Sequence, residues 1–153
     1  MIHSLNRSRA LELTLMVLLS GLFACAFGEI RPNDPMDRQA SLEKQHTHYT
    51  DLVRWSQFEE AATYVEPADR NGFIRQMPEF DEVRFTDWKA DTWEFEDPET
   101  LDRAVIDVTY RGYSLYTPFE VKIHETQEWT RSGRSNSWKV VSHFKDLGRL
   151  AEK

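Results

Sequence analysis

The spacing of apolar residues changes at Pro78 and divides the chain into a helical first half and a strand-rich second half. Between residues 36 and 65, apolar side chains recur mostly three or four positions apart, which is the pattern of one helix face. After Pro78 they alternate with polar residues, which is the pattern of half-buried strands. Helices followed by consecutive strands predict an α+β domain over residues 34–144, with helices packed on one face of a four-stranded antiparallel sheet.

Capping residues and prolines predict where the helices begin and end. Asp34 is predicted to cap the first helix and Pro35 to occupy its first position. A bend is expected near Trp55-Ser56, and Glu66 precedes a proline, so the helix should end there. A short further helix is predicted over residues 67–77, with three residues facing inward: Phe73, Ile74 and Met77.

The second half predicts four strands separated by turn-forming residues. The first is expected to start at Val83, with Phe85 and later Trp93 and Phe95 on its inward face. Residues 104–111 form the second strand, residues 112–118 a loop or irregular crossing, and residues 119–129 the third strand. A hairpin turn over 132–136 leads to a last strand that reaches Phe144, and residues 145–153 are a polar tail.

An uncharged run from Leu13 to Phe23 follows two arginines near the N-terminus. As a helix these residues would rise only about 17 Å, which is too short for the ~30 Å hydrocarbon core of a membrane but fits a secretion signal. The next residues, Leu22-Phe23-Ala24-Cys25, resemble the bacterial lipobox, although Phe23 is larger than the usual residue there.

This resemblance implies that residues 1–24 are removed as a signal peptide and that Cys25 receives lipid chains that bind the membrane. Residues 25–33 would then form a tether. Ala26 is not the Asp associated with retention in the inner membrane, so the resemblance implies the outer membrane, facing the periplasm. A soluble secreted form and an uncleaved anchor remain as alternatives.

Composition excludes several classes of function. The chain carries 26 Asp and Glu against 19 Lys and Arg, a net charge of −7, which argues against sequence-independent binding of nucleic acid. A single cysteine excludes an internal disulfide framework and multi-cysteine metal sites. His46 and His48 lie two residues apart on the predicted helix and would diverge, so no metal is expected. None of the common nucleotide-binding or serine-nucleophile motifs occurs, and no cofactor is predicted.

Two sequence segments near the C-terminus carry a further resemblance. T-Q-E-W at Thr126–Trp129, a glycine-containing turn, and S-W-K-V-V at Ser137–Val141 follow the long and short helices. Together they resemble the nuclear transport factor two-like, or cystatin-like, cone, over about residues 35–144. Small bacterial lipoproteins often resemble this fold. It hosts isomerases, cyclases, dehydratases and many non-enzymatic binding proteins, so the resemblance implies a fold more than an activity.

Enzymes of this fold place an acid, or a His–Asp pair, in the mouth of the cone, where burial moves its pKa toward the working pH. Strict alternation puts Asp87 and Glu125 at inward positions, and Tyr110 on the same face. These three residues are the catalytic candidates if the protein is an enzyme. Two alternatives remain open: strand ends that simply become polar, or a β-bulge that shifts the register.

The loop after the second strand is rich in aromatic residues and is a candidate contact surface through Tyr113, Leu115 and Tyr116. The favoured hypothesis is therefore a non-enzymatic lipoprotein, bound to membrane lipid through Cys25, that contacts an envelope protein or a small hydrophobic ligand. The alternative is a small proton-transfer enzyme, isomerase- or cyclase-like, with a buried carboxylate. A homodimer that pairs through the open sheet is a third hypothesis.

Overall fold

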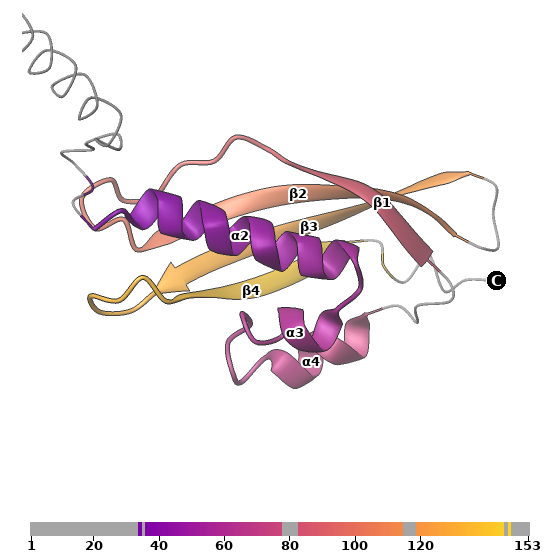
Figure 1. Ribbon diagram of the computed structural model, residues 1–153, viewed down its shortest axis with the longest axis horizontal. Coiled ribbons are helices and arrows are strands. Elements are labelled where there is room, and N and C mark those ends of the chain that lie inside the picture. The colour runs from indigo at the N-terminus through magenta and orange to yellow at the C-terminus, as the bar shows by residue number, and fades with distance from the viewer. Residues whose placement is uncertain (1–33, 35, 78–82, 115–118, 146, 148–153) are drawn as a thin grey trace, which may run out of the picture. The chain divides into compact units, whose positions relative to one another are not determined.

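A computed structural model of the chain describes residues 34, 36–77, 83–114, 119–145 and 147 (Figure 1). All the described helices and strands belong to one compact unit, Met36–Lys153. The predicted mixture of helices followed by strands is confirmed. In chain order the elements are α2 (Arg38–Arg54), α3 (Phe58–Ala61), α4 (Arg70–Gln76), β1 (Val83–Ala90), β2 (Arg103–Ser114), β3 (Glu120–Arg131) and β4 (Trp138–Lys145).

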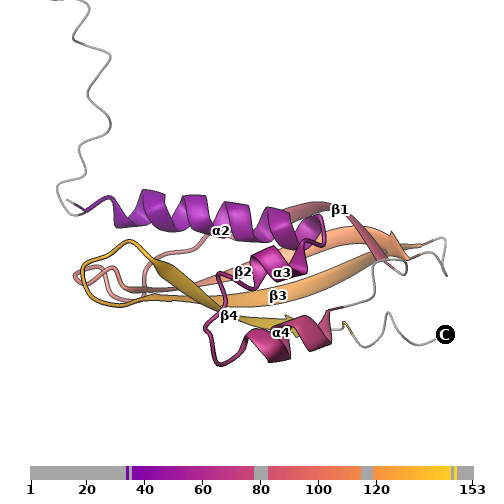
Figure 2. The same cartoon turned by 60° about the horizontal axis from the view of Figure 1, so that its bottom comes forward.

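The four strands form one open antiparallel sheet in the order β1-β2-β3-β4, as the sequence predicted. Each strand pairs with its neighbour in the chain, so β1 and β4 are the two edges. Helix α2 runs along one face of this sheet, and α4 lies beside β4 (Figures 1 and 2). The connections from β2 to β3 and from β3 to β4 are too short for the crossover that a parallel pairing would require.

The core lies between α2 and one face of the sheet. Along β2, every second residue from Ala104 to Ser114 is buried and those between are mostly exposed, the alternation of a strand with one solvated face. Helix α2 contributes Leu42, Tyr49 and Val53, all fully buried. The opposite face of the sheet is mostly exposed and carries charged and polar side chains, together with the exposed Val105 and Tyr113.

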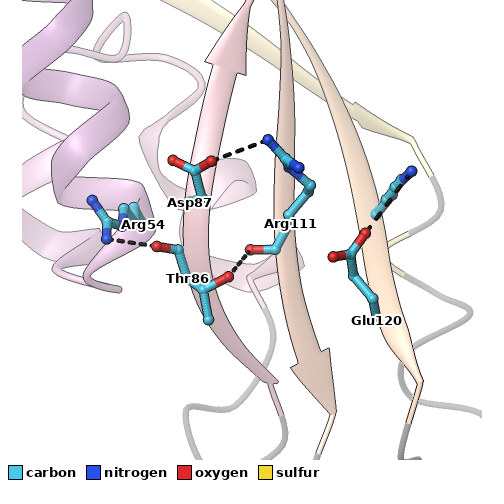
Figure 3. A network of polar contacts seen from close by, with 6 residues as sticks. Arg54, Thr86, Asp87, Arg111 and Glu120 are labelled. Atoms are coloured by element: carbon cyan, nitrogen blue, oxygen red, sulfur yellow. Dashed lines mark hydrogen bonds and ion pairs between the residues drawn. The ribbon is translucent and has the colours of Figure 1, made fainter.

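Contacts on that exposed outer face are polar (Figure 3). Arg111 on β2 donates to Asp87 on β1 over 3.1 Å. Arg54, from the end of α2 on the other face, reaches the edge strand β1 and donates to the backbone carbonyl oxygen of Thr86 over 2.6 Å. Lys122 and Glu120 approach to 3.9 Å on β3. Exposed pairs of this kind contribute at most about 1 kcal/mol each, so this face is held by the ladder hydrogen bonds rather than by its charges.

The helical region bends where predicted but begins later. Helix α2 ends at Arg54, Ser56 has a positive φ of 58°, and α3 starts at Phe58. The prediction that Asp34 caps this helix is wrong. Asp37 precedes the first helical residue with a φ of 53° and makes no side-chain capping hydrogen bond. Its left-handed conformation turns the chain, and the helix therefore starts at Arg38.

Helix α4 is shorter than the predicted 67–77 and buries a narrower face. Phe73 is 3% exposed and Met77 packs partly against the core, but Ile74 is 36% exposed, so its predicted inward placement is wrong. Phe73 lies in α4 and Met77 directly follows it, and both pack against the core. Ile74 is rotated from Phe73 by about 100° and faces outward.

Two strand boundaries also differ from the prediction. Strand β2 continues through Gly112 to Ser114, where a loop was expected. Strand β3 begins at Glu120, which pairs with Tyr113, and Phe119, the predicted first residue of this strand, lies before it and is 74% exposed. Gly112 sits opposite Phe85, and a Cβ atom on it would lie 2.3 Å from the carbonyl oxygen of Arg84. The glycine is therefore required by close approach of β1, not by a turn. Beyond β1, the predicted continuation through Trp93 and Phe95 is reduced to an isolated bridge between Phe95 and Ala104.

Candidate functional site

A carboxylate lies at the centre of the core. Glu125 on β3 is 1% exposed and receives hydrogen bonds from four side chains. Its Oε1 accepts from the hydroxyls of Tyr49 at 2.7 Å and Ser142 at 2.5 Å. Its Oε2 accepts from the hydroxyl of Tyr110 and from Nε2 of Gln127, both at 2.7 Å. The four donors come from α2, β2, β3 and β4, so this one side chain joins the helix to three strands.

The four bonds fill the acceptor capacity of the group. An ionised carboxylate offers about four lone-pair positions on its two oxygens, and each oxygen of Glu125 already has two donors. Burial raises the pKa of Glu125 above its usual value of 4.5, and the four hydrogen bonds oppose this shift. Burial is the larger effect.

The two tyrosines act as donors to Glu125. Burial, and then the nearby charge of Glu125, raise the pKa of both Tyr49 and Tyr110 well above the usual value of 10.0. Both phenols therefore keep their protons at neutral pH. Each is a fixed hydrogen-bond donor to the carboxylate, in the way that preorganised donors stabilise a buried negative charge.

Gln127 connects Glu125 to a second layer of buried polar groups. Its Nε2 also donates to Oγ1 of Thr50 over 3.2 Å. Its Oε1 accepts from Nε1 of Trp129 at 2.9 Å and pairs with Nδ1 of His46 at 2.8 Å. Because an amide oxygen only accepts, Nδ1 of His46 must carry the proton in this contact. The amide of Gln127 thus uses both of its donor hydrogens and both of its lone pairs.

His46 is held as a neutral ring. It is 3% exposed, and the rings of Trp88 and Trp129 meet it edge-on at centroid distances of 5.7 and 6.4 Å. Burial lowers its pKa below the usual 6.5, opposed by the hydrogen bond to Gln127 and by the charges of Glu43 and Asp51. Its Nε2 is buried and finds no hydrogen-bond partner within the described ranges.

The structure brings together two of the three catalytic candidates. Tyr110 and Glu125 are in direct contact, but the inward placement of Asp87 is wrong, because its side chain is 57% exposed and pairs with Arg111. A β-bulge between Phe85 and Asp87 reverses the alternation, as one of the two alternative interpretations anticipated. Trp88 takes the inward side instead, and its Nε1 donates to Asp51 over 2.8 Å.

The other members of the site were not identified from the sequence. A signal was present on β3, where Ile123, Glu125, Gln127 and Trp129 share one face, so that two polar residues interrupt an inward apolar row. Tyr49 belongs to the apolar residues spaced three or four positions apart between residues 36 and 65, a pattern that predicts an ordinary core position. Ser142 is two residues from Val140 on β4, so alternation places both side chains on the inward face.

Several predicted residues lie elsewhere or outside the described part of the chain. Tyr113 is 47% exposed near the end of β2, and its role as a contact residue stays a prediction. Cys25, Leu115 and Tyr116 lie outside the described residues. His48 is exposed whereas His46 is buried, so the two histidines diverge as predicted.

The composition and lengths of the described elements bear on metal binding and on membranes. No group of three or more His, Cys, Asp or Glu residues there could hold a metal ion. Among the helices that the structure describes, none is long and apolar enough to cross a membrane.

A small groove lies next to the buried site, between α4 and β4. It has a volume of about 240 Å³. Ser142 is shared between the two features, since it lines the groove and its hydroxyl donates to Glu125. The lining residues are Val65, Asp69, Gly72, Phe73, Gln76, Val141, Ser142 and His143.

Comparisons with protein families, with curated proteins and with solved structures found no match to this chain.

Proposed function

We propose that this chain is a lipid-anchored envelope protein whose folded domain is a non-enzymatic binding or interaction module. One observation carries the non-enzymatic part: every acceptor position of the buried Glu125 is already occupied by a donor of the protein itself. The anchored part is supported by the resemblance of Leu22–Cys25 to a lipobox.

A general base must bring a free lone pair within hydrogen-bond reach of the proton that it removes. Glu125 offers none, and it is 1% exposed. Neither Tyr49 nor Tyr110 can take up a proton, because burial raises both pKa values and keeps both phenols protonated. The carboxylate therefore serves to fix α2 on the sheet. This supports binding over the alternative of isomerase- or cyclase-like proton transfer.

Anchoring would depend on acyl chains rather than on charge. The chain has a net charge of −7, and an acidic protein is repelled by anionic lipid. Two or three acyl chains at Cys25, at about 0.8 kcal/mol per buried methylene, would hold it stably at the membrane. A helix lying along an antiparallel four-stranded sheet supports the nuclear transport factor two-like cone as the fold proposed for the domain.

Metabolic labelling tests the anchor. Cells that express the full chain or the Cys25→Ser variant are grown with a radioactive fatty acid, and each protein is then isolated. We expect label in the wild type and none in the variant. Equal labelling of both proteins would remove Cys25 as the site of lipidation.

Hydrogen exchange into a substrate tests the absence of proton transfer. The full chain is incubated in heavy water with a panel of enolisable ketones and thioesters, and deuterium incorporation is followed by mass spectrometry. We expect the wild type and the Glu125→Gln variant to give the same background rate. A wild-type rate above that of Glu125→Gln would show that the carboxylate is a working base and would overturn the proposal.

A further inference from the structure

The backbone of β4 has a free position at the edge of the sheet. The N–H of Val140 donates to the carbonyl of Tyr64 over 3.0 Å, and its carbonyl accepts from Glu66 over 3.3 Å. Two residues earlier, the N–H of Trp138 donates to the Gln45 side chain. These groups point away from β3, and outward-pointing groups recur at every second residue of an antiparallel strand. Ser142 is therefore the next residue whose N–H and C=O point outward.

The backbone N–H and C=O of Ser142 have no protein partner in the described part of the chain. They lie beside the groove that Ser142 lines. An adjacent outward donor and acceptor on a strand edge form the arrangement that pairs with the peptide bond of another strand. The edge is thus occupied at Val140 by residues 64–66 and open at Ser142.

Helix α4 leaves room for an occupant at this edge. Gly72 of this helix lines the groove, and a Cβ added to Gly72 would meet no atom within 4 Å. The apolar part of the lining comes from Val65, Phe73 and Val141. At about 240 Å³ the groove is smaller than the roughly 300–1,000 Å³ of sites for drug-sized ligands. A short stretch of backbone with one small or apolar side chain suits it better than a cofactor.

We infer that this groove binds an extended peptide segment of a partner protein, which adds to β4 by exchanging backbone hydrogen bonds with Ser142. Residues 64–66 already make the same kind of contact, since Val65 forms a parallel bridge with Val140. The peptide continues this row along the edge, and one of its side chains enters the space beside Gly72. This inference rests on the proposed function, because it names the partner of a binding module.

Two pairs of variants separate backbone pairing from other effects. Ser142→Pro removes the outward N–H, and proline is tolerated on a strand edge where that N–H makes no ladder bond. Ser142→Ala is its matched control, because it loses the hydroxyl but keeps the N–H. Gly72→Phe fills the groove, and Gly72→Ala is the control that adds only a methyl group to open space.

The experiment selects binders from a random heptapeptide library on the full chain held in detergent micelles. Binding of selected peptides is measured by fluorescence anisotropy, and exchange of the Ser142 amide by NMR. We expect peptides that bind the wild type and both alanine controls within about threefold, and that bind Ser142→Pro and Gly72→Phe at least about tenfold more weakly. Bound peptide should slow exchange of the Ser142 amide by at least about tenfold.

Three results would overturn the inference: no enrichment over a parallel selection on Gly72→Phe, equal binding to Ser142→Pro and Ser142→Ala, or a Ser142 amide that is already protected without peptide. The last would show that the chain covers its own edge. Circular dichroism establishes the folding of each variant, and if Ser142→Pro does not fold, the Gly72 pair decides. None of these outcomes changes the labelling of Cys25 or the deuterium experiment, so failure of the peptide site is distinct from failure of the proposed function.

Discussion

The hydroxyl of Tyr49 donates to Oε1 of Glu125 over 2.7 Å and thereby joins α2 to β3 across 76 residues of sequence. This contact lies inside a core that is otherwise mostly apolar. Apolar packing alone would allow a helix to slide or rotate on a sheet with little loss, whereas a buried polar contact has one geometry. Tyr49 and Glu125 therefore fix the position of the helix on the sheet.

Removing this donor should destabilise the fold. In Tyr49→Phe, Oε1 of Glu125 loses one of its two donors while remaining buried, and an unsatisfied buried group costs about 1–3 kcal/mol. We expect the free energy of unfolding in urea at neutral pH to fall by this amount. Tyr64→Phe is the control, because this ring is only partly buried and its hydroxyl makes no hydrogen bond within the described residues. A Tyr49→Phe protein as stable as Tyr64→Phe would contradict the role assigned to the contact.

The pKa of Glu125 predicts the sign of a pH effect. Because burial raises it above the usual 4.5, the folded protein binds this proton more tightly than the unfolded chain does. Glu125 therefore contributes its full stabilisation at pH values below its pKa in the unfolded chain. This contribution is lost as the pH rises through its pKa in the folded protein. The difference in free energy of unfolding between the wild type and Glu125→Gln should therefore shrink as the pH rises above about 4.

Urea titrations of the two proteins at a series of pH values measure this difference. Asp87→Asn serves as the comparison, because it removes a carboxylate from the exposed outer face of the sheet. A difference between the wild type and Glu125→Gln that grows with pH would mean that the four donors outweigh burial.

Asp87 and Glu125 show how far the sequence could predict the site. Alternation placed both carboxylates inward, and this was right on β3, which is regular, and wrong on β1, which contains a bulge. A bulge adds one residue to a strand, and nothing in the pattern around Phe85 marks it except Trp88, which resumes the inward row. Local alternation predicts a face only as long as the ladder is unbroken.

His46 predicts an opposite pH dependence at lower pH. Burial lowers its pKa below 6.5, so the unfolded chain binds this proton more readily than the folded protein does. The stability that depends on the neutral ring is present at neutral pH. It declines as the pH falls below the pKa of this histidine in the unfolded chain. We expect His46→Gln to lose less stability than the wild type between about pH 7 and about pH 5. Thermal unfolding measures the loss, and His124→Gln on the outer face should behave like the wild type.

Gly112→Ala should be strongly destabilising for its size. A Cβ at this position would lie 2.3 Å from the backbone oxygen of Arg84 on β1. A backbone atom cannot move aside as the end of a flexible side chain can. Overpacking of this kind costs about 1–3 kcal/mol. The matched substitution Gly72→Ala meets no atom and lies in a helix, where alanine is favoured by up to about 1 kcal/mol. Opposite changes in the urea midpoint are therefore expected, and a harmless Gly112→Ala would place β1 farther from β2 than the structure does.

The order of helices and strands could be predicted from the sequence because it depends on local spacing and on turn residues. The buried site could not, because its members depend on pairing between distant segments. Tyr49 is indistinguishable from a core aromatic until Glu125 is placed opposite it, and Ser142 is an ordinary strand serine until its hydroxyl is seen to face that carboxylate.

The parallel bridge between Val65 and Val140 has a consequence for how the chain reaches its native state. The two residues are far apart in sequence, so loop closure delays their meeting. Until then, more of the β4 edge is open to pair with other molecules. Substitutions that loosen the docking of residues 64–66 should therefore produce self-association at high concentration before they produce a measurable loss of secondary structure.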